Sequence, residues 1–297
     1  MAPLAGGHGG ETFLATSAGE RTVVRIYAHR GASRGPDAVD VDAAVLRLVR
    51  GLLPVAEVLE VRRPDPALGT PGLLVTSFLP GERLDLVLPG LDAARRAVLG
   101  EHVGDLLARL AQMPTLRGGL FADGDLSIAP VPRAMEDLPG WVESHRGTSA
   151  LADWLESDFA ALLKVADDAQ GLLDRLDRTC LVHSDVNPKN LLVDPDSLAV
   201  TGLVDWEFAH SGLPVTDLGN LLRFERDPVL TVAVVERVRE QVPDAGAGEV
   251  QDVRAADLYA LVDLAGRRGD NPVADRAHTQ LAAIARTGDL HAVAAPA

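Results

Sequence analysis

The sequence predicts an α+β fold in which a small antiparallel sheet with one helix precedes a larger, mainly helical region. β-rich runs dominate the first 80 residues, and long amphipathic stretches dominate the rest. The breaker pair Pro80-Gly81 marks the change between them. We therefore expect one domain at residues 1–80 and a second domain at residues 81–297.

The first domain has four β-rich runs and one helical pattern. The turn signal Ser17-Ala18-Gly19-Glu20 joins the first two runs and predicts a hairpin. One face of the helical pattern is apolar, which predicts that it packs on the sheet. The runs lie at residues 12–16, 21–27, 55–61 and 73–78, with the helix at 40–50.

Helical periodicity dominates the second domain and is interrupted by a short pair of strands. The turn signal Asp194-Pro195-Asp196-Ser197 separates these two apolar runs, so we expect a hairpin. The helical stretches lie at residues 91–113, 150–177, 217–224, 229–241 and 250–268, and the strands at 191–193 and 199–204.

Composition limits the class of protein. No apolar run reaches the ~18 residues of a membrane-spanning helix, no leader pattern opens the chain, and Cys180 is the single cysteine. We therefore expect a cytoplasmic protein that does not enter the membrane. The net charge of −15 disfavours nucleic acid as a partner and favours cationic partners.

The chemistry is concentrated in the segment from His183 to Asn190, which contains Asp185 and Lys189, together with Asp205 fifteen residues after Asn190. If the two strands between Asn190 and Asp205 form a hairpin, these side chains meet at its open end, beside the loop that carries Asp185. Oxygen ligands of this kind suit Mg²⁺. Asp185 is then placed to accept a proton from an attacking hydroxyl, as phosphoryl transfer requires.

The pattern His-x-Asp-x-x-x-x-Asn with a later Asp resembles the catalytic segment of protein kinases. Together with Gly212-Leu213-Pro214-Val215-Thr216-Asp217, it more closely resembles the aminoglycoside phosphotransferase and choline kinase superfamily. The resemblance covers roughly residues 5–225. It implies a two-lobed protein-kinase-like fold and an ATP- (or GTP-) and Mg²⁺-dependent small-molecule kinase.

The resemblance also implies roles for single residues. Asp185 matches the catalytic base, and Asn190 and Asp205 match the Mg²⁺ ligands. His183 matches a residue that braces the catalytic loop, and Asp217 matches a buried structural acid. Lys189 has no counterpart in protein kinases. Because Lys164 is the only other lysine in the chain, we expect Lys189 to contact phosphate or backbone.

On the nucleotide side, the resemblance implies a glycine-rich turn over the phosphates that contains Gly7, Gly9 and Gly10. Arg25 stands where the family has a phosphate-binding lysine, and Asp42 stands where it has the glutamate that pairs with this lysine. We therefore expect an Arg25–Asp42 ion pair. The resemblance also implies a hinge between the lobes, where adenine would hydrogen-bond to the backbone of Ser77 and Leu79.

The sequence says less about the substrate than about the reaction. We expect a cationic small molecule, and name Glu207, Asp153, Glu156 and Asp158 as candidate contacts for it. The sequence of the catalytic segment most closely resembles that of antibiotic-inactivating members of this superfamily, including those that act on viomycin and capreomycin. Two alternatives stay open: a metabolic kinase of the choline, homoserine or sugar type, and a nucleotide-binding pseudokinase. We expect a monomer or a homodimer.

Overall fold

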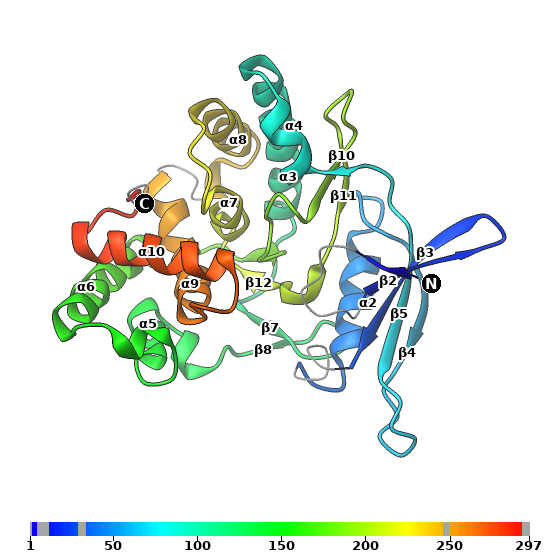
Figure 1. Cartoon of the computed structure of the whole chain (residues 1–297), viewed down its shortest axis with the longest axis horizontal. Helices are drawn as coiled ribbons and strands as arrows, with labels where there is room; N and C mark the ends of the chain where they lie inside the picture. Colours follow the sequence, from blue (N-terminus) through cyan, green and yellow to red (C-terminus); the bar gives the residue numbers. More distant parts are fainter. Residues whose placement is uncertain (1, 5–11, 29–33, 246–249, 293–297) are drawn as a thin grey trace.

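The computed structural model describes residues 2–4, 12–28, 34–245 and 250–292, which form two lobes (Figure 1). The first lobe is a five-stranded antiparallel sheet in the order β1-β2-β3-β5-β4, with helix α2 (Ala38–Val49) packed against β4 and β5. The strands are β1 (Ala2–Pro3), β2 (Thr12–Ser17), β3 (Glu20–Tyr27), β4 (Val58–Arg62) and β5 (Gly72–Ser77).

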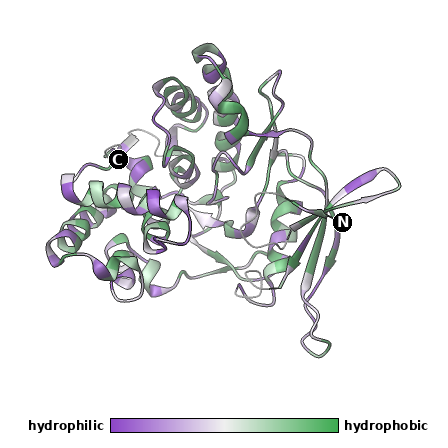
Figure 2. Ribbon diagram, in the orientation of Figure 1, coloured by the Kyte–Doolittle hydropathy of each residue, from purple (hydrophilic) through white to green (hydrophobic). Residues whose placement is uncertain are grey.

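The β2–β3 hairpin is set by its turn. Ser17 pairs with Glu20, which leaves Ala18 and Gly19 as a two-residue loop with positive φ at both positions. Positive φ at both central residues gives the turn type whose twist matches that of paired strands. Figure 2 shows that the sheet is mostly hydrophobic, whereas the outer part of this hairpin is hydrophilic. The predicted hairpin and the helix predicted at residues 40–50 are confirmed.

The chain passes between the lobes at Gly81. This glycine has φ +125°, and a Cβ there would overlap the hydroxyl of Thr201, which itself donates to Pro80 O at 2.8 Å. The next strand, β6 (Glu82–Arg83), immediately joins a second sheet in the order β11-β10-β6. That sheet contains the predicted hairpin of β10 (Leu191–Val193) and β11 (Val200–Leu203).

The second lobe is mainly helical and carries a third sheet of short strands in the order β8-β7-β12-β9. Its helices are α3 (Leu84–Val87), α4 (Ala93–Ala111), α5 (Leu138–His145), α6 (Glu156–Leu173), α7 (Val215–Leu222), α8 (Pro228–Gln241), α9 (Val250–Gly266) and α10 (Pro272–Thr287). The strands are β7 (Gly119–Phe121), β8 (Ile128–Ala129), β9 (Cys180–Val182) and β12 (His210–Gly212).

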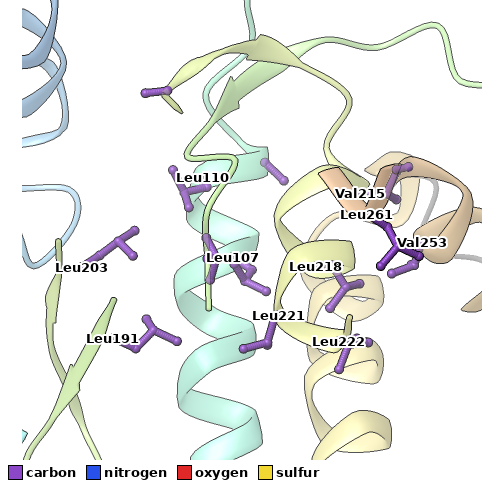
Figure 3. Close-up of a cluster of buried hydrophobic side chains, with 14 of the residues drawn as sticks. Leu107, Leu110, Leu191, Leu203, Val215, Leu218, Leu221, Leu222, Val253 and Leu261 are labelled. Carbon is purple, nitrogen blue, oxygen red and sulfur yellow. The ribbon is translucent and has the colours of Figure 1, made fainter. Parts of the chain in front are cut away.

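Buried leucines and valines join the catalytic hairpin to the helices. Figure 3 shows α4, with Leu107 and Leu110, between the strands that carry Leu191 and Leu203 on one side and α7 on the other. α4 also packs closely on α8, because Gly100 and Gly104 have no side chain to separate the two helices. The hairpin is thereby fixed to a rigid helical base.

Several elements differ from the sequence-based expectation. The stretch predicted as one helix at 150–177 is a 3-10 turn (Ala150–Asp153) followed by α6, because Trp154 and Leu155 are extended between them. The elements that were not predicted are helices α3, α5 and α10 and the short strands β1, β6, β7, β8, β9 and β12. Among the described residues, none of the helices is long and apolar enough to cross a membrane.

Candidate active site

The segment between β9 and β10 forms a loop that is anchored from below by Asp217 in the first turn of α7. Asp217 Oδ2 accepts the backbone N–H of His183 at 2.9 Å, and its Oδ1 accepts that of Ser184 at 2.7 Å. Ser184 has φ +66°, a left-handed conformation that is uncommon outside glycine. Burial raises the pKa of the Asp217 carboxyl to about 6, against the two N–H donors.

His183 is a fully buried brace of this loop. Its Nδ1 accepts the backbone N–H of Asp185 at 3.2 Å, and its Nε2 lies 3.0 Å from Val204 O. The proton of the neutral ring therefore belongs on Nε2, which donates to that carbonyl. Burial lowers the pKa of His183 to about 4, so the ring is neutral at physiological pH. This geometry agrees with a bracing role and not with proton transfer to a substrate.

Two side-chain amides hold the Asp185 carboxylate. Asn187 Nδ2 donates to Oδ1 at 2.9 Å, and Asn190 Nδ2 donates to Oδ2 at 2.8 Å. Burial raises the pKa of Asp185 to about 6, while the bond from Asn187 and the positive charge of Arg223 oppose the rise. Asp185 is thus an oriented carboxylate whose protonation changes near pH 6. Asn187 was not singled out from the sequence, although it lies inside the catalytic segment.

The hairpin brings Asn190 and Asp205 together as predicted. Leu191 pairs with Leu203, and just beyond this pair the Val204 N–H donates to Asn190 O at 3.0 Å. Asp205 follows at once with φ +67°, a second left-handed residue in the site. Asp tolerates this conformation better than most residues. The ends of two antiparallel strands therefore place the acid and the amide at one edge.

Arg25 of β3 reaches across from the first lobe to this edge. Its Nη1 lies 2.7 Å from Asp205 Oδ1, and its Nη2 is paired with Glu207 Oε2. The prediction that Arg25 pairs with Asp42 is wrong for this structure. Both Asp42 oxygens are bound by Arg34, and Oδ2 also accepts the Tyr27 hydroxyl at 2.6 Å.

The site offers oxygen ligands that fit Mg²⁺. The Asn190 amide nitrogen faces Asp185, so its oxygen is turned the other way, and the Asp205 side chain remains 40% exposed. The described residues contain no group of three or more His, Cys, Asp and Glu side chains that could hold a metal ion. A magnesium ion here would draw its other ligands from water and phosphate, which is its usual preference.

Comparison with known proteins decides the family. A profile of the phosphotransferase enzyme family matches residues 1–259. The chain belongs to the phosphotransferase enzyme family.

Solved structures show the same fold as this phosphotransferase. A thermostable mutant of the aminoglycoside phosphotransferase APH(4)-Ia, in complex with ADP and hygromycin B, superposes with a TM-score of 0.67 at 18% identity, over 96% of this chain and 92% of that one. The GDP complex of aminoglycoside 2'-phosphotransferase-IIIa gives a TM-score of 0.69 at 17% identity, over 97% and 92%. The predicted two-lobed, protein-kinase-like fold is confirmed.

Curated relatives are much longer than this phosphotransferase. Mouse acyl-CoA dehydrogenase family member 10 is 27% identical over 167 residues, which is 56% of this chain but 15% of that protein. Mouse acyl-CoA dehydrogenase family member 11 is 24% identical over 181 residues, or 58% of this chain and 21% of that protein. The chain thus matches only a small part of the length of these relatives.

A buried ion pair lies behind the catalytic loop of the phosphotransferase. Arg223 donates to both oxygens of Asp257, at 2.7 Å from Nη2 to Oδ1 and 2.9 Å from Nε to Oδ2, and Asn220 Nδ2 donates to Oδ1 at 3.0 Å. Neither Arg223 nor Asp257 was singled out from the sequence. The available signal for Arg223 was an arginine six residues after Asp217, directly after the helix that anchors the loop.

The structure describes only some of the residues that were predicted to contact the nucleotide. Gly7, Gly9 and Gly10 lie outside the described residues. The Ser77 N–H already donates to Glu57 O at 2.8 Å, so this donor is occupied. Leu79 lies against Gly202 of β11, where a Cβ on the glycine would come within 3.0 Å of Leu79 Cδ1. The Leu79 side chain therefore lies at the junction of the two lobes.

The remaining predicted residues lie outside this constellation. Lys189 is exposed, and its backbone N–H donates to Asn187 Oδ1 at 2.9 Å. Asp153 is exposed at the end of the 3-10 turn before α6, and Glu156 and Asp158 are exposed at the start of α6. Figure 1 shows α6 far from the β10–β11 hairpin. Glu156 is paired with Arg146. The structure does not bring these three acids together with Asp185.

Proposed function

We propose that this phosphotransferase transfers the γ-phosphoryl group of ATP to a hydroxyl of a cationic small molecule, with Mg²⁺ bound through Asn190 and Asp205. One observation carries the proposal: the Asp185 carboxylate is held by two amides, beside the hairpin edge where Asn190 and Asp205 meet. This arrangement supports a proton acceptor beside oxygen ligands for a hard cation, because phosphoryl transfer requires little more than positioning and charge neutralisation.

In the proposed reaction, the oxygen of the substrate hydroxyl bonds to the γ-phosphorus while Asp185 accepts the proton of that hydroxyl. The bond between the γ-phosphorus and the oxygen of the leaving ADP breaks. Asn187 and Asn190 keep the carboxylate in one orientation while it accepts the proton. When bound, Mg²⁺ neutralises charge on the phosphates. His183 and Asp217 hydrogen-bond to backbone groups and hold the loop in place.

We further propose that the acceptor is an antibiotic of the aminoglycoside or tuberactinomycin type, such as viomycin or capreomycin. The net charge of −15 supports a polycationic acceptor through long-range attraction. Similarity in fold to a phosphotransferase solved with hygromycin B adds support for this class. Phosphorylation of such a compound would confer resistance on the host.

The test is ADP release by the purified protein with ATP and Mg²⁺ across a panel of acceptors. The panel holds aminoglycosides, viomycin and capreomycin, with choline and homoserine as metabolic controls. We expect Mg²⁺-dependent ADP release with one antibiotic class and a matching rise in tolerance in a host that expresses the gene. Turnover with choline or homoserine alone would overturn the antibiotic proposal. Nucleotide binding without ADP release for any acceptor would favour the pseudokinase alternative.

A further inference from the structure

The guanidinium of Arg25 is shared between two carboxylates at the edge of the site. Nη1 pairs with Asp205 and Nη2 with Glu207, so one cation bridges both acids. The side chain of Arg25 is 19% exposed. The bridge also spans the lobes, because Arg25 lies on β3 and both acids follow β11.

The two acids differ sharply in burial. The Glu207 side chain is only 8% exposed, whereas that of Asp205 is 40% exposed. Water screens an ion pair at an exposed carboxylate strongly, and it screens one at a buried carboxylate much less. Arg25 is therefore held more firmly by Glu207 than by Asp205, and Asp205 is the acid that can exchange its partner.

We propose that Arg25 is a built-in counter-ion of the cation site. In the ligand-free protein it occupies Asp205, and when a divalent cation takes Asp205 the guanidinium stays on Glu207. Glu207 is then a positioning residue for Arg25 and not a contact for the substrate. The inference rests on the proposed function in one respect, namely that Asp205 is a metal ligand.

Competition for Asp205 makes a measurable prediction about metal binding without nucleotide. Arg25 and the cation exclude each other from one carboxylate, so removal of the guanidinium must tighten cation binding. The gain in binding free energy equals the coupling free energy between Arg25 and the cation. We expect Arg25→Met to bind Mn²⁺ at least ~5-fold more tightly than the wild type, which corresponds to the lower end of typical coupling free energies. The measurement is a titration of free Mn²⁺ by electron paramagnetic resonance.

Arg21→Met is the matched control. Arg21 lies on the same strand, and its guanidinium is over the Phe78 ring, 3.9 Å from the centroid. The change removes the same charge from the protein without touching Asp205, so Mn²⁺ affinity should stay within about twofold of the wild type, as expected for a screened exposed charge. Equal tightening in both variants, or none in Arg25→Met, would overturn the proposal.

A double-mutant cycle tests the role of Glu207. In the wild-type background, Glu207→Gln releases Arg25 from its anchor and leaves it to Asp205, so Mn²⁺ binding should weaken. In the Arg25→Met background the same change should weaken Mn²⁺ binding by a much smaller factor. If Glu207 were itself a metal ligand, it would weaken Mn²⁺ binding by the same factor in both backgrounds, and that outcome would refute the positioning role.

Folding of the variants is checked by thermal melts with and without Mn²⁺. If Arg25→Met does not fold, Arg25→Lys replaces it, because a single ammonium on a shorter stem cannot bridge both acids. Arg25→Lys should show the same tightening to a smaller extent, and unchanged affinity would count against the proposal. All these titrations omit nucleotide and acceptor. A protein with no turnover would therefore contradict the proposed function without deciding this inference.

Discussion

Asn190 Nδ2 lies 2.8 Å from Asp185 Oδ2, so the proposed metal ligand also orients the proposed base. The nitrogen and the oxygen of the Asn190 side-chain amide lie in one rigid plane, so they turn together. The hydrogen bond to Asp185 therefore fixes where the Asn190 oxygen points, and the geometry of the base and of the cation site depend on each other.

Asp185→Asn removes the proton acceptor and keeps the volume of the side chain. We expect turnover to fall by roughly 10²- to 10⁴-fold, the usual contribution of a positioned general base. Nucleotide affinity, measured by calorimetry, should change little. Asp196→Asn, in the exposed turn of the same hairpin, is the control and should retain full turnover. Near-normal turnover of Asp185→Asn would remove Asp185 from its proposed role.

The pKa of Asp185 predicts the acid side of the pH profile. Burial raises this pKa to about 6, and only the deprotonated carboxylate can accept a proton. We therefore expect kcat/KM for the nucleotide to rise with pH up to about 6 and to level off above it, because this parameter reports the free enzyme. The residual activity of Asp185→Asn should lack the inflection. An inflection that persists in that variant would assign it to another group.

Asp217→Asn tests the anchor of the catalytic loop. The buried carboxylate accepts two backbone N–H groups, and an amide can accept only one of them. We expect the free energy of unfolding to fall by about 1–3 kcal/mol, the cost of one unsatisfied buried donor. Urea denaturation measures the loss, with Asp167→Asn on the exposed face of α6 as the control. Equal stability of the two variants would contradict the anchoring role.

Gly219→Ala tests the close packing of α7 on α9. A Cβ at Gly219 would lie 2.6 Å from the Val253 carbonyl oxygen, which is backbone and cannot move aside alone. We expect the variant to lose about 1–3 kcal/mol of stability through overpacking.

The matched control for Gly219→Ala is Gly171→Ala on α6, where no atom lies within 4 Å of the added methyl group. It should gain about 0.5–1 kcal/mol, because alanine is the better helix former. A denaturation midpoint that rises in Gly219→Ala, as it should in Gly171→Ala, would show that the contact with α9 is not tight.

The fold and the core of the site were predictable because their determinants are local. Turn residues between apolar runs predicted both hairpins, and the hairpin from Asn190 to Asp205 needs only a short chain to bring its ends together. The short spacing from His183 to Asn190 fixes one loop. The strands β9 and β12 escaped prediction because three residues carry too little periodicity to distinguish a strand from a loop.

The partners of the charged residues were decided by the tertiary structure alone. Arg25 and Asp205 are 180 residues apart, and nothing in their local sequence selects Asp205 over Asp42. Arg25 pairs with Asp205 because β3 faces the β10–β11 hairpin across the lobes. Asp42 is instead paired with Arg34. Turns and spacing act locally, so they were enough to predict which residues meet at the end of the β10–β11 hairpin. Only the packing of distant elements decided which charges meet.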